Sequence, residues 1–144
     1  MATGDYVVFI DDDDWVADDY VQSILEAIAH RPDCIGFRID CSMNGQPKTA
    51  VGSLRYKAWE DNKDGYDYVR SIYHKNPVKR ELALRTGYKD MRYAEDHDYS
   101  MRLQQWLGTE YFIDKVLYYY RYSNAIPHNT KYGIHGEQYK GVRY

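Results

Sequence analysis

Four aspartates in a row, at positions 11–14, directly follow an apolar run, and this pairing constrains the fold more than any other feature of the chain. The run DYVVFI at 5–10 is rich in β-branched and aromatic residues and does not alternate with polar ones. Such a pattern predicts a short strand that is covered on both faces, as in a parallel sheet. Adjacent carboxylates repel one another, so we expect the turn after this strand to lie in solvent or around a cation.

The segment after the aspartates predicts a helix and then a second strand. Asp18 or Asp19 can cap this helix, and RPD at 31–33 ends it. CIGFRIDCSM at 34–43 has the composition of a strand. Strand, helix and strand in this order favour an α/β fold. Apolar residues at helical spacing predict the buried stripe of the helix, which consists of Val21, Ile24, Leu25 and Ile28.

Turn residues and helical patterns divide the rest of the chain, and nothing in it has the composition of a linker between domains. We therefore expect a single domain over 1–144, with an irregular tail at 122–144. The predicted elements are a turn at 44–48 (NGQPK), a loop with short strand or helix pieces at 51–73, a helix that begins near Pro77 and ends at Gly87, a helix at 94–108 with Tyr99, Leu103, Trp106 and Leu107 on one face, and one or two strands at 110–122.

The composition is that of an ordinary globular protein and argues against two classes of protein. The 144 residues carry a net charge of −3, whereas nucleic-acid-binding proteins usually carry a basic excess. No apolar run approaches the roughly 20 residues of a membrane span, and the N-terminus lacks the basic region of a signal peptide. Cys34 and Cys41 lack the spacing of a zinc site, so we expect reduced, partly buried thiols. With neither a membrane span nor a signal peptide, a cytoplasmic location is expected.

The aspartate turn offers oxygen ligands where α/β proteins bind their ligands, at the carboxyl end of a strand. Carboxylates hold Mg²⁺ or Mn²⁺ while phosphates complete the coordination, so the turn predicts a divalent metal that carries a diphosphate. A solvated acidic turn that caps the next helix is an alternative. A calcium loop counted from Asp11 would need glycine and glutamate where Val16 and Gln22 stand. A phosphatase of the DxDx type would carry threonine or valine in place of Trp15.

A second acidic pair, Glu95 and Asp96, lies in the first turn of the helix predicted at 94–108. Carboxylates there stabilise a helix through its dipole, and Asp98 with Arg102 would form an i,i+4 pair worth only tenths of a kcal/mol. A purely structural role is therefore one interpretation of Glu95 and Asp96. The other is catalytic, because a carboxylate beside a cleft can act as general base for a hydroxyl group.

Several segments, taken in order, resemble the motifs of the family 2 glycosyltransferases. GDYVVFIDDDDWVADDYV at 4–21 resembles the strand that runs into the DxD metal motif, and NPVKRELALRTGY at 76–88 resembles the acceptor-side helix. AEDHDYSMRL at 94–103 resembles the helix with the Glu-Asp pair, and VLYYYRYSNAIPHNT at 116–130 resembles the closing strand. The resemblance implies an α/β fold of the A type, with a Rossmann-like sheet and flanking helices.

The resemblance implies which residues hold the metal and the nucleotide. Asp11 and Asp13 match the two aspartates of DxD, with Asp13 as the more direct ligand of Mn²⁺ or Mg²⁺ and Asp11 near the ribose or a metal-bound water. Asp14 matches the third acidic position of the nucleotide site. His128 lies where some members supply a histidine to the metal.

The resemblance also implies the reaction, a hexosyl transfer from a nucleotide-sugar donor to a saccharide or other hydroxyl acceptor with inversion. Asp96 matches the general base of inverting members, and Glu95 beside it would position the acceptor or a loop. Arg102 matches an arginine of the same helix, where its role would be structural.

Family 2 domains usually begin with a strand, a helix and a DDxSxD segment that hold the base and ribose, and these have no counterpart before residue 11. We therefore expect a fold that is truncated at its N-terminus. A homo-oligomer or a companion chain would cover the sheet edge and apolar face that the missing half leaves, and a companion chain would supply nucleotide binding. The alternative function is a non-catalytic scaffold or binding module derived from a glycosyltransferase.

Overall fold

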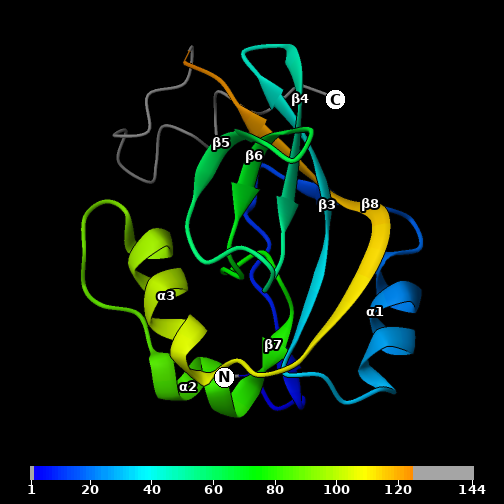
Figure 1. The fold of residues 1–144 in the computed structure, drawn as a ribbon, viewed down its shortest axis with the longest axis vertical. Helices are drawn as coiled ribbons and strands as arrows, with labels where there is room; N and C mark the ends of the chain where they lie inside the picture. The colour runs from blue at the N-terminus through cyan, green and yellow to red at the C-terminus, as the bar shows by residue number, and fades with distance from the viewer. Residues whose placement is uncertain (1, 125–144) are drawn as a thin grey trace.

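The computed structural model describes residues 2–124, which form a mixed α/β fold with a twisted sheet and helices at its sides (Figure 1). In chain order, the elements are β1 (Tyr6–Val7), β2 (Trp15–Val16), α1 (Tyr20–Ile28), β3 (Cys34–Met43), β4 (Gln46–Gly52), β5 (Glu60–Lys63), β6 (Tyr66–Arg70), β7 (Val78–Lys79), α2 (Arg80–Thr86), α3 (Glu95–Leu103), the 3₁₀ turn η1 (Gln104–Trp106) and β8 (Glu110–Tyr122). The predicted α/β class is confirmed for these residues.

Strand β3 is the centre of the sheet and pairs with three other strands. It runs antiparallel to β4 and β7 and parallel to β8. Beyond β4, strand β6 pairs in parallel and β5 closes that side, while β1 continues the sheet beyond β7. Because β8 lies against β3 along nearly its whole length, residues near 118–120 reach the same end of the sheet as the aspartate turn.

The first strand is shorter than its apolar run, and the prediction of a strand covered on both faces over 5–10 is wrong. Strand β1 ends the described sheet and pairs only with β7, in antiparallel orientation. Phe9 and Ile10 lie beyond the end of this strand and are 48% and 46% exposed. The Phe9 amide still donates to the His74 carbonyl (3.0 Å), and this bond brings the aspartate turn beside residues 74 and 75.

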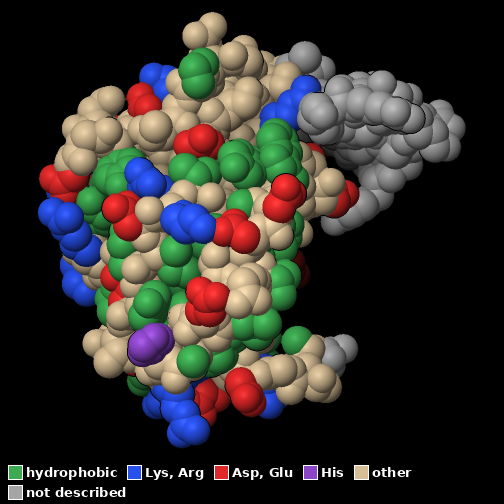
Figure 2. Space-filling view, turned by 90° about the vertical axis from the view of Figure 1, so that its right-hand side faces the viewer, with side chains coloured by type: hydrophobic (Ala, Val, Ile, Leu, Met, Phe, Trp, Pro, Cys, Tyr) green, Lys and Arg blue, Asp and Glu red, His purple; other side chains and the backbone are tan. Residues whose placement is uncertain are grey.

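Helix α1 forms where the sequence predicts it, and two of the four residues of the predicted stripe, Ile24 and Ile28, pack in the core. Tyr20, Ile24 and Ala27 are buried, whereas Val21 and Leu25 are 67% and 58% exposed. The Tyr20 ring packs edge-on against Phe37 of β3 (centroids 6.1 Å apart), so the face of α1 that carries Tyr20 lies against the sheet. Figure 2 shows the resulting surface on the α1 and β8 side, where hydrophobic side chains are interspersed with charged ones.

Two tight turns shape the region 44–73, for which the sequence predicts a turn at 44–48 and a loop at 51–73. Asn44 and Gly45 both have positive φ, 53° and 80°, and join β3 to β4 as a two-residue hairpin. Asp64 and Gly65, with φ of 52° and 83°, join β5 to β6 in the same way. Residues 51–73 therefore contain two short strands and the end of β4, because each turn brings its flanking segments into register.

Helices α2 and α3 lie together at the side of the sheet opposite α1 (Figure 1). Gly87 ends α2 with φ of 59°, as its position predicts. Arg102 of α3 donates to the carbonyls of Thr86 and Gly87, the latter at 2.8 Å. These hydrogen bonds hold the end of α2 against α3. The core between these helices and the sheet consists of Cys34, Ile72, Val78, Tyr99 and Leu103.

A second core lies between α1 and the sheet, and it includes Ile35, Phe37 and Ile39 of β3 with Leu117 and Tyr118 of β8. Cys34 and Cys41 are both free and buried, which confirms the prediction of reduced thiols. Burial raises the pKa of the Cys41 thiol to about 12, so this thiol is protonated at neutral pH.

Candidate active site

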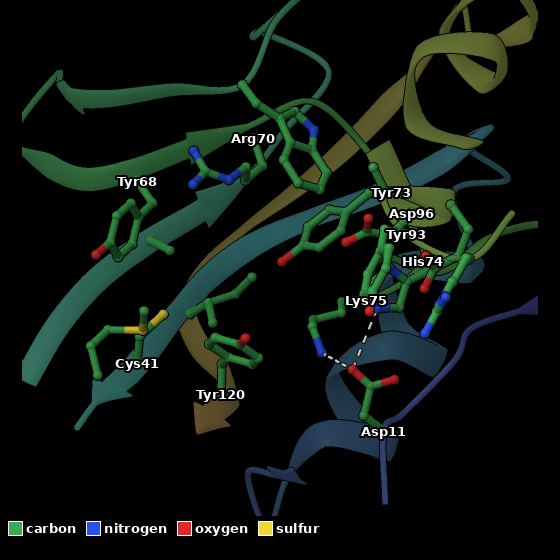
Figure 3. A pocket seen from close by; sticks show the side chains of 17 residues that line it. Asp11, Cys41, Tyr68, Arg70, Tyr73, His74, Lys75, Tyr93, Asp96 and Tyr120 are labelled. Atoms are coloured by element: carbon green, nitrogen blue, oxygen red, sulfur yellow. Dashed lines mark hydrogen bonds and ion pairs between the residues drawn. The ribbon is translucent and has the colours of Figure 1, made fainter. Parts of the chain in front are cut away.

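A pocket of about 590 Å³ lies between the sheet and the first turn of α3 (Figure 3). Its lining comes from segments that are far apart in the sequence: the aspartate turn, β3, β4, β6, β8 and the start of α3. The lining residues are Asp11, Ile39, Cys41, Met43, Ala50, Trp59, Tyr68, Arg70, Tyr73, His74, Lys75, Arg92, Tyr93, Ala94, Glu95, Asp96 and Tyr120.

Asp11 faces this pocket beside two basic side chains. Its carboxylate accepts a hydrogen bond from the Lys75 ammonium group and lies 3.5 Å from His74 Nε2. The hydrogen bond from His74, together with Lys75, holds the pKa of Asp11 well below its usual range. Asp11 is therefore ionised throughout the physiological pH range, with Oδ2 bound by the Lys75 ammonium group and close to the His74 ring.

Asp14 points away from the pocket, into the protein, and its side chain is 0% exposed. It accepts hydrogen bonds from Lys75 Nζ (2.6 Å) and the Tyr118 hydroxyl (2.7 Å) on Oδ2, and from the Arg121 amide (2.9 Å) on Oδ1. These three donors use both oxygens, so Asp14 anchors the turn to β8 and is not among the residues that line the pocket.

Tyr118 completes this anchor because its hydroxyl also accepts from Lys75 Nζ (3.0 Å) and from the Asp11 amide (3.3 Å). The Lys75 ammonium group lies 4.6 Å from the centroid of the Tyr118 ring and 4.9 Å from that of Tyr120. Burial and the bond to Asp14 raise the pKa of the Tyr118 hydroxyl far above its usual range, so it remains a donor.

Asp12 and Asp13 occupy the outer part of the turn. Asp12 is exposed and Asp13 is half-buried, and neither is among the pocket-lining residues. Burial, followed by the neighbouring carboxylate of Asp14, raises the pKa of Asp13. Asp13 thus lies in a locally negative environment in which a cation would be favourable.

The predicted metal ligands are only partly brought together. Among residues 2–124, no group of three His, Cys, Asp or Glu side chains is arranged to hold a metal ion. Asp11 and Asp13 lie in one turn, and one or two carboxylates suffice for Mg²⁺ when phosphates complete the coordination. His128 lies outside the described residues.

Glu95 and Asp96 line the pocket from the first turn of α3. The turn begins at Ala94, which has left-handed backbone geometry (φ 59°) and brings the chain sharply into the helix. Asp96 Oδ1 accepts from the His97 amide (2.7 Å). Asp98 instead binds Arg102 (2.7 Å), which confirms the predicted i,i+4 pair. Unlike Glu95 and Asp96, Asp98 is not among the pocket-lining residues.

Sequence reasoning missed the basic residues of the pocket, above all Lys75, which is only 4% exposed. No local signal for it stands out, because HKNPV at 74–78 is mostly polar in composition and its burial is visible only in the structure. Trp59, Tyr68, Arg70 and Tyr73 were missed as well, because the segment 51–73 shows no regular pattern.

A family model described as Glycosyl transferase family 2 matches residues 1–129. The chain belongs to this family. The predicted resemblance is thereby confirmed, and glycosyl transfer is the general activity that family membership supports.

The fold is similar to that of S. aureus TarS, known from its crystal structure, with a TM-score of 0.57 and 16% sequence identity. The similarity covers 85% of this chain and 22% of that chain, so the chain spans about a fifth of the length of TarS. At this identity the likeness shows the fold alone, which is the predicted A-type glycosyltransferase fold. A search of curated proteins found no match. Within residues 2–124, no helix is long and apolar enough to cross a membrane.

Proposed function

We propose that the chain transfers a sugar from a nucleotide-sugar donor to a saccharide or other hydroxyl acceptor, with a divalent metal and with inversion at the anomeric carbon. The observation that carries the proposal is the shared pocket of Asp11 and Asp96, which come from the two motifs of the family that bear acidic residues (Figure 3). The pocket volume of about 590 Å³ is in the range of small-ligand sites.

Asp96 is the proposed general base. As the acceptor oxygen attacks the anomeric carbon, Asp96 would take the proton of that hydroxyl, and the bond between this carbon and the diphosphate oxygen would break. The bond from the His97 amide to Oδ1 fixes the carboxylate in the helix turn. Glu95 lines the pocket beside Asp96 and would position the acceptor.

Asp11 and Asp13 are the proposed ligands of Mn²⁺ or Mg²⁺. A bound metal ion would act as a Lewis acid on the leaving nucleoside diphosphate. The negative environment of Asp13, with carboxylates on either side, supports its role as a ligand. Lys75 would keep Asp11 oriented through its bonds to Asp11 and Asp14, and would add positive charge near the leaving group.

The proposal is tested by the release of nucleoside diphosphate from a panel of UDP- and GDP-sugars, with and without Mn²⁺. Asp96→Asn should lower the turnover of the wild-type protein by about 10²–10⁴-fold, as expected for the loss of a general base. Asp90→Asn is the matched control, because Asp90 is exposed and does not line the pocket. Product with retained anomeric configuration would contradict inversion.

The metal site has a separate test that does not depend on turnover. Mn²⁺ with UDP or GDP should raise the melting temperature of the wild-type protein, and Asp13→Ala should abolish this shift. Asp12→Ala should preserve it, because Asp12 is exposed and outside the proposed ligand pair. If calorimetry detects no nucleotide or donor binding, with or without metal, a non-catalytic binding module becomes the better description.

We further propose that a second chain covers part of the surface, as a homo-oligomer or a companion that contributes to nucleotide binding. The exposed apolar side chains Phe9, Ile10, Val21 and Leu25 support this. Light scattering at micromolar concentration tests it, and a strictly monomeric mass would contradict the homo-oligomer. The two free, buried cysteines are typical of a reducing compartment, so we propose the cytoplasm as the location.

A further inference from the structure

One end of the pocket differs in chemistry from the aspartate end, because aromatic side chains from separate segments form its walls. We call it the aromatic recess and define it by Trp59, Tyr68, Tyr73 and Tyr120. Figure 3 shows Tyr68, Tyr73 and Tyr120 around the same cavity, with Arg70 beside Tyr68. Apolar side chains of β3 and β4, such as Ile39 and Ala50, also line the pocket.

Trp59 is held in the recess by contacts on several sides. Its ring packs edge-on against Tyr73 (centroids 5.4 Å apart) and against His97 (5.0 Å). The Arg70 guanidinium lies 5.1 Å from the ring centroids of both Trp59 and Tyr68. A side chain fixed in this way loses little conformational entropy when a ligand packs on it, so the recess is preorganised for binding.

Helix α3 fixes Trp59 through a hydrogen bond from Nε1 to Ser100 Oγ (3.2 Å). Ser100 is fully buried, and its hydroxyl also bonds the Ile72 carbonyl (2.8 Å) and the Ser71 hydroxyl (2.7 Å). Ser100 follows Asp96 by four residues, about one helical turn, so both side chains lie on the same face of α3. The recess and the proposed base are thus held by one rigid element.

We propose that the aromatic recess binds a pyranose ring of the acceptor, and that Ser100 is a positioning residue that sets Trp59 relative to Asp96. The assignment of the ring to the acceptor rests on the proposed function. One face of a pyranose consists mainly of C–H groups, which pack favourably on aromatic rings, while its hydroxyl groups can meet the polar atoms of Arg70 and the tyrosines. The donor sugar is bonded to the diphosphate, which belongs at the aspartate end.

The first test measures the equilibrium binding of simple sugars to the protein by ligand-observed NMR. The ligands are the methyl β-glycosides of glucose, galactose and N-acetylglucosamine. Sorbitol is the comparison ligand because it offers hydroxyl groups without a ring face. At least one glycoside should bind the wild-type protein more tightly than sorbitol, and Trp59→Ala should weaken that binding about tenfold or more. Trp106→Ala is the matched control, because Trp106 does not line the pocket. Far-UV circular dichroism verifies that both variants fold.

Equal binding of glycosides and sorbitol, absence of glycoside binding, or equal binding by Trp59→Ala and the wild type would each overturn the proposal. This test needs no turnover, so it remains decisive if no donor is consumed and the proposed function fails. Conversely, the wild type can consume a donor while Trp59→Ala binds glycosides normally; the recess proposal then fails and the proposed function stands.

The second test separates positioning from folding by comparing Ser100→Ala with Ser71→Ala. Both remove a hydroxyl of the same buried pair, and Ser100 is the member that accepts the hydrogen bond from Trp59 Nε1. Ser100→Ala should raise the KM for the acceptor several-fold. Ser71→Ala should leave the KM for the acceptor unchanged. An unchanged KM in Ser100→Ala, or an equal rise in both variants, would show that Ser100 is merely structural.

Discussion

Replacement of Lys75 by methionine is the most informative perturbation, because Lys75 joins the aspartate turn to the sheet. The ammonium group bonds Asp11, Asp14 Oδ2 (2.6 Å) and the Tyr118 hydroxyl (3.0 Å), and the side chain is only 6% exposed. Methionine fills a similar volume, so the substitution removes the charge with little change in packing. Asp14, whose side chain is 0% exposed, would be left as a buried anion without its cation.

Loss of one partner of a buried ion pair costs about 3–5 kcal/mol of folding free energy. Asp14 would keep its bonds from the Tyr118 hydroxyl and the Arg121 amide, so we expect the lower end of this range, about 3 kcal/mol. For a chain of this size, such a loss lowers the melting temperature by roughly 6–12 °C. Urea unfolding followed by far-UV circular dichroism at pH 7 measures it.

Lys79→Met is the matched control, because the Lys79–Asp33 pair has the same chemistry but is 30% and 19% exposed. It should cost no more than about 1 kcal/mol. Asp14→Asn combined with Lys75→Met should be more stable than the sum of the single losses predicts, since the double variant leaves no buried charge at this pair. A loss below about 1 kcal/mol in Lys75→Met, or one equal to that of the control, would refute the reasoning.

Three further predictions concern the centre of the sheet. Gly36→Ala should destabilise the protein by about 1–3 kcal/mol in urea unfolding, because the new Cβ would lie 2.2 Å from Glu110 Oε1 and 2.8 Å from the Gly52 carbonyl. Gly52→Ala should have a similar cost, since its Cβ would lie 2.5 Å from Oδ1 of the buried Asn76; wild-type stability in either variant would contradict the packing. Burial raises the pKa of Glu110 above its ordinary 4.5, so its contribution to stability falls as pH rises through the interval from 4.5 to the raised folded-state pKa. The stability of Glu110→Gln relative to the wild type should therefore increase between pH 4 and pH 7, as measured by unfolding at both values, and a constant difference would argue against this linkage.

Local sequence was sufficient to predict the turns and helix ends at which the backbone needs a positive φ. Asn44 and Gly45 tolerate positive φ and produce the β3–β4 hairpin, and Gly87 ends α2 for the same reason. The acidic turn and the pair at the start of α3 were also recognisable, because their residue types and order match a known family. These signals lie within a few neighbouring residues, so no knowledge of long-range contacts was needed.

The interior of the site was decided only by the tertiary structure. Nothing near Asp14 indicates that it turns inward, because its partners Lys75 and Tyr118 come from distant segments. The pairing of β2 with β8 brings Tyr118 to the turn, and the bond from the Phe9 amide to the His74 carbonyl brings Lys75 there. The link from Trp59 to Ser100 is likewise a contact between a loop and a helix. Local patterns encode dihedral preferences and exposure, whereas the partner of a buried charge depends on how the whole sheet assembles.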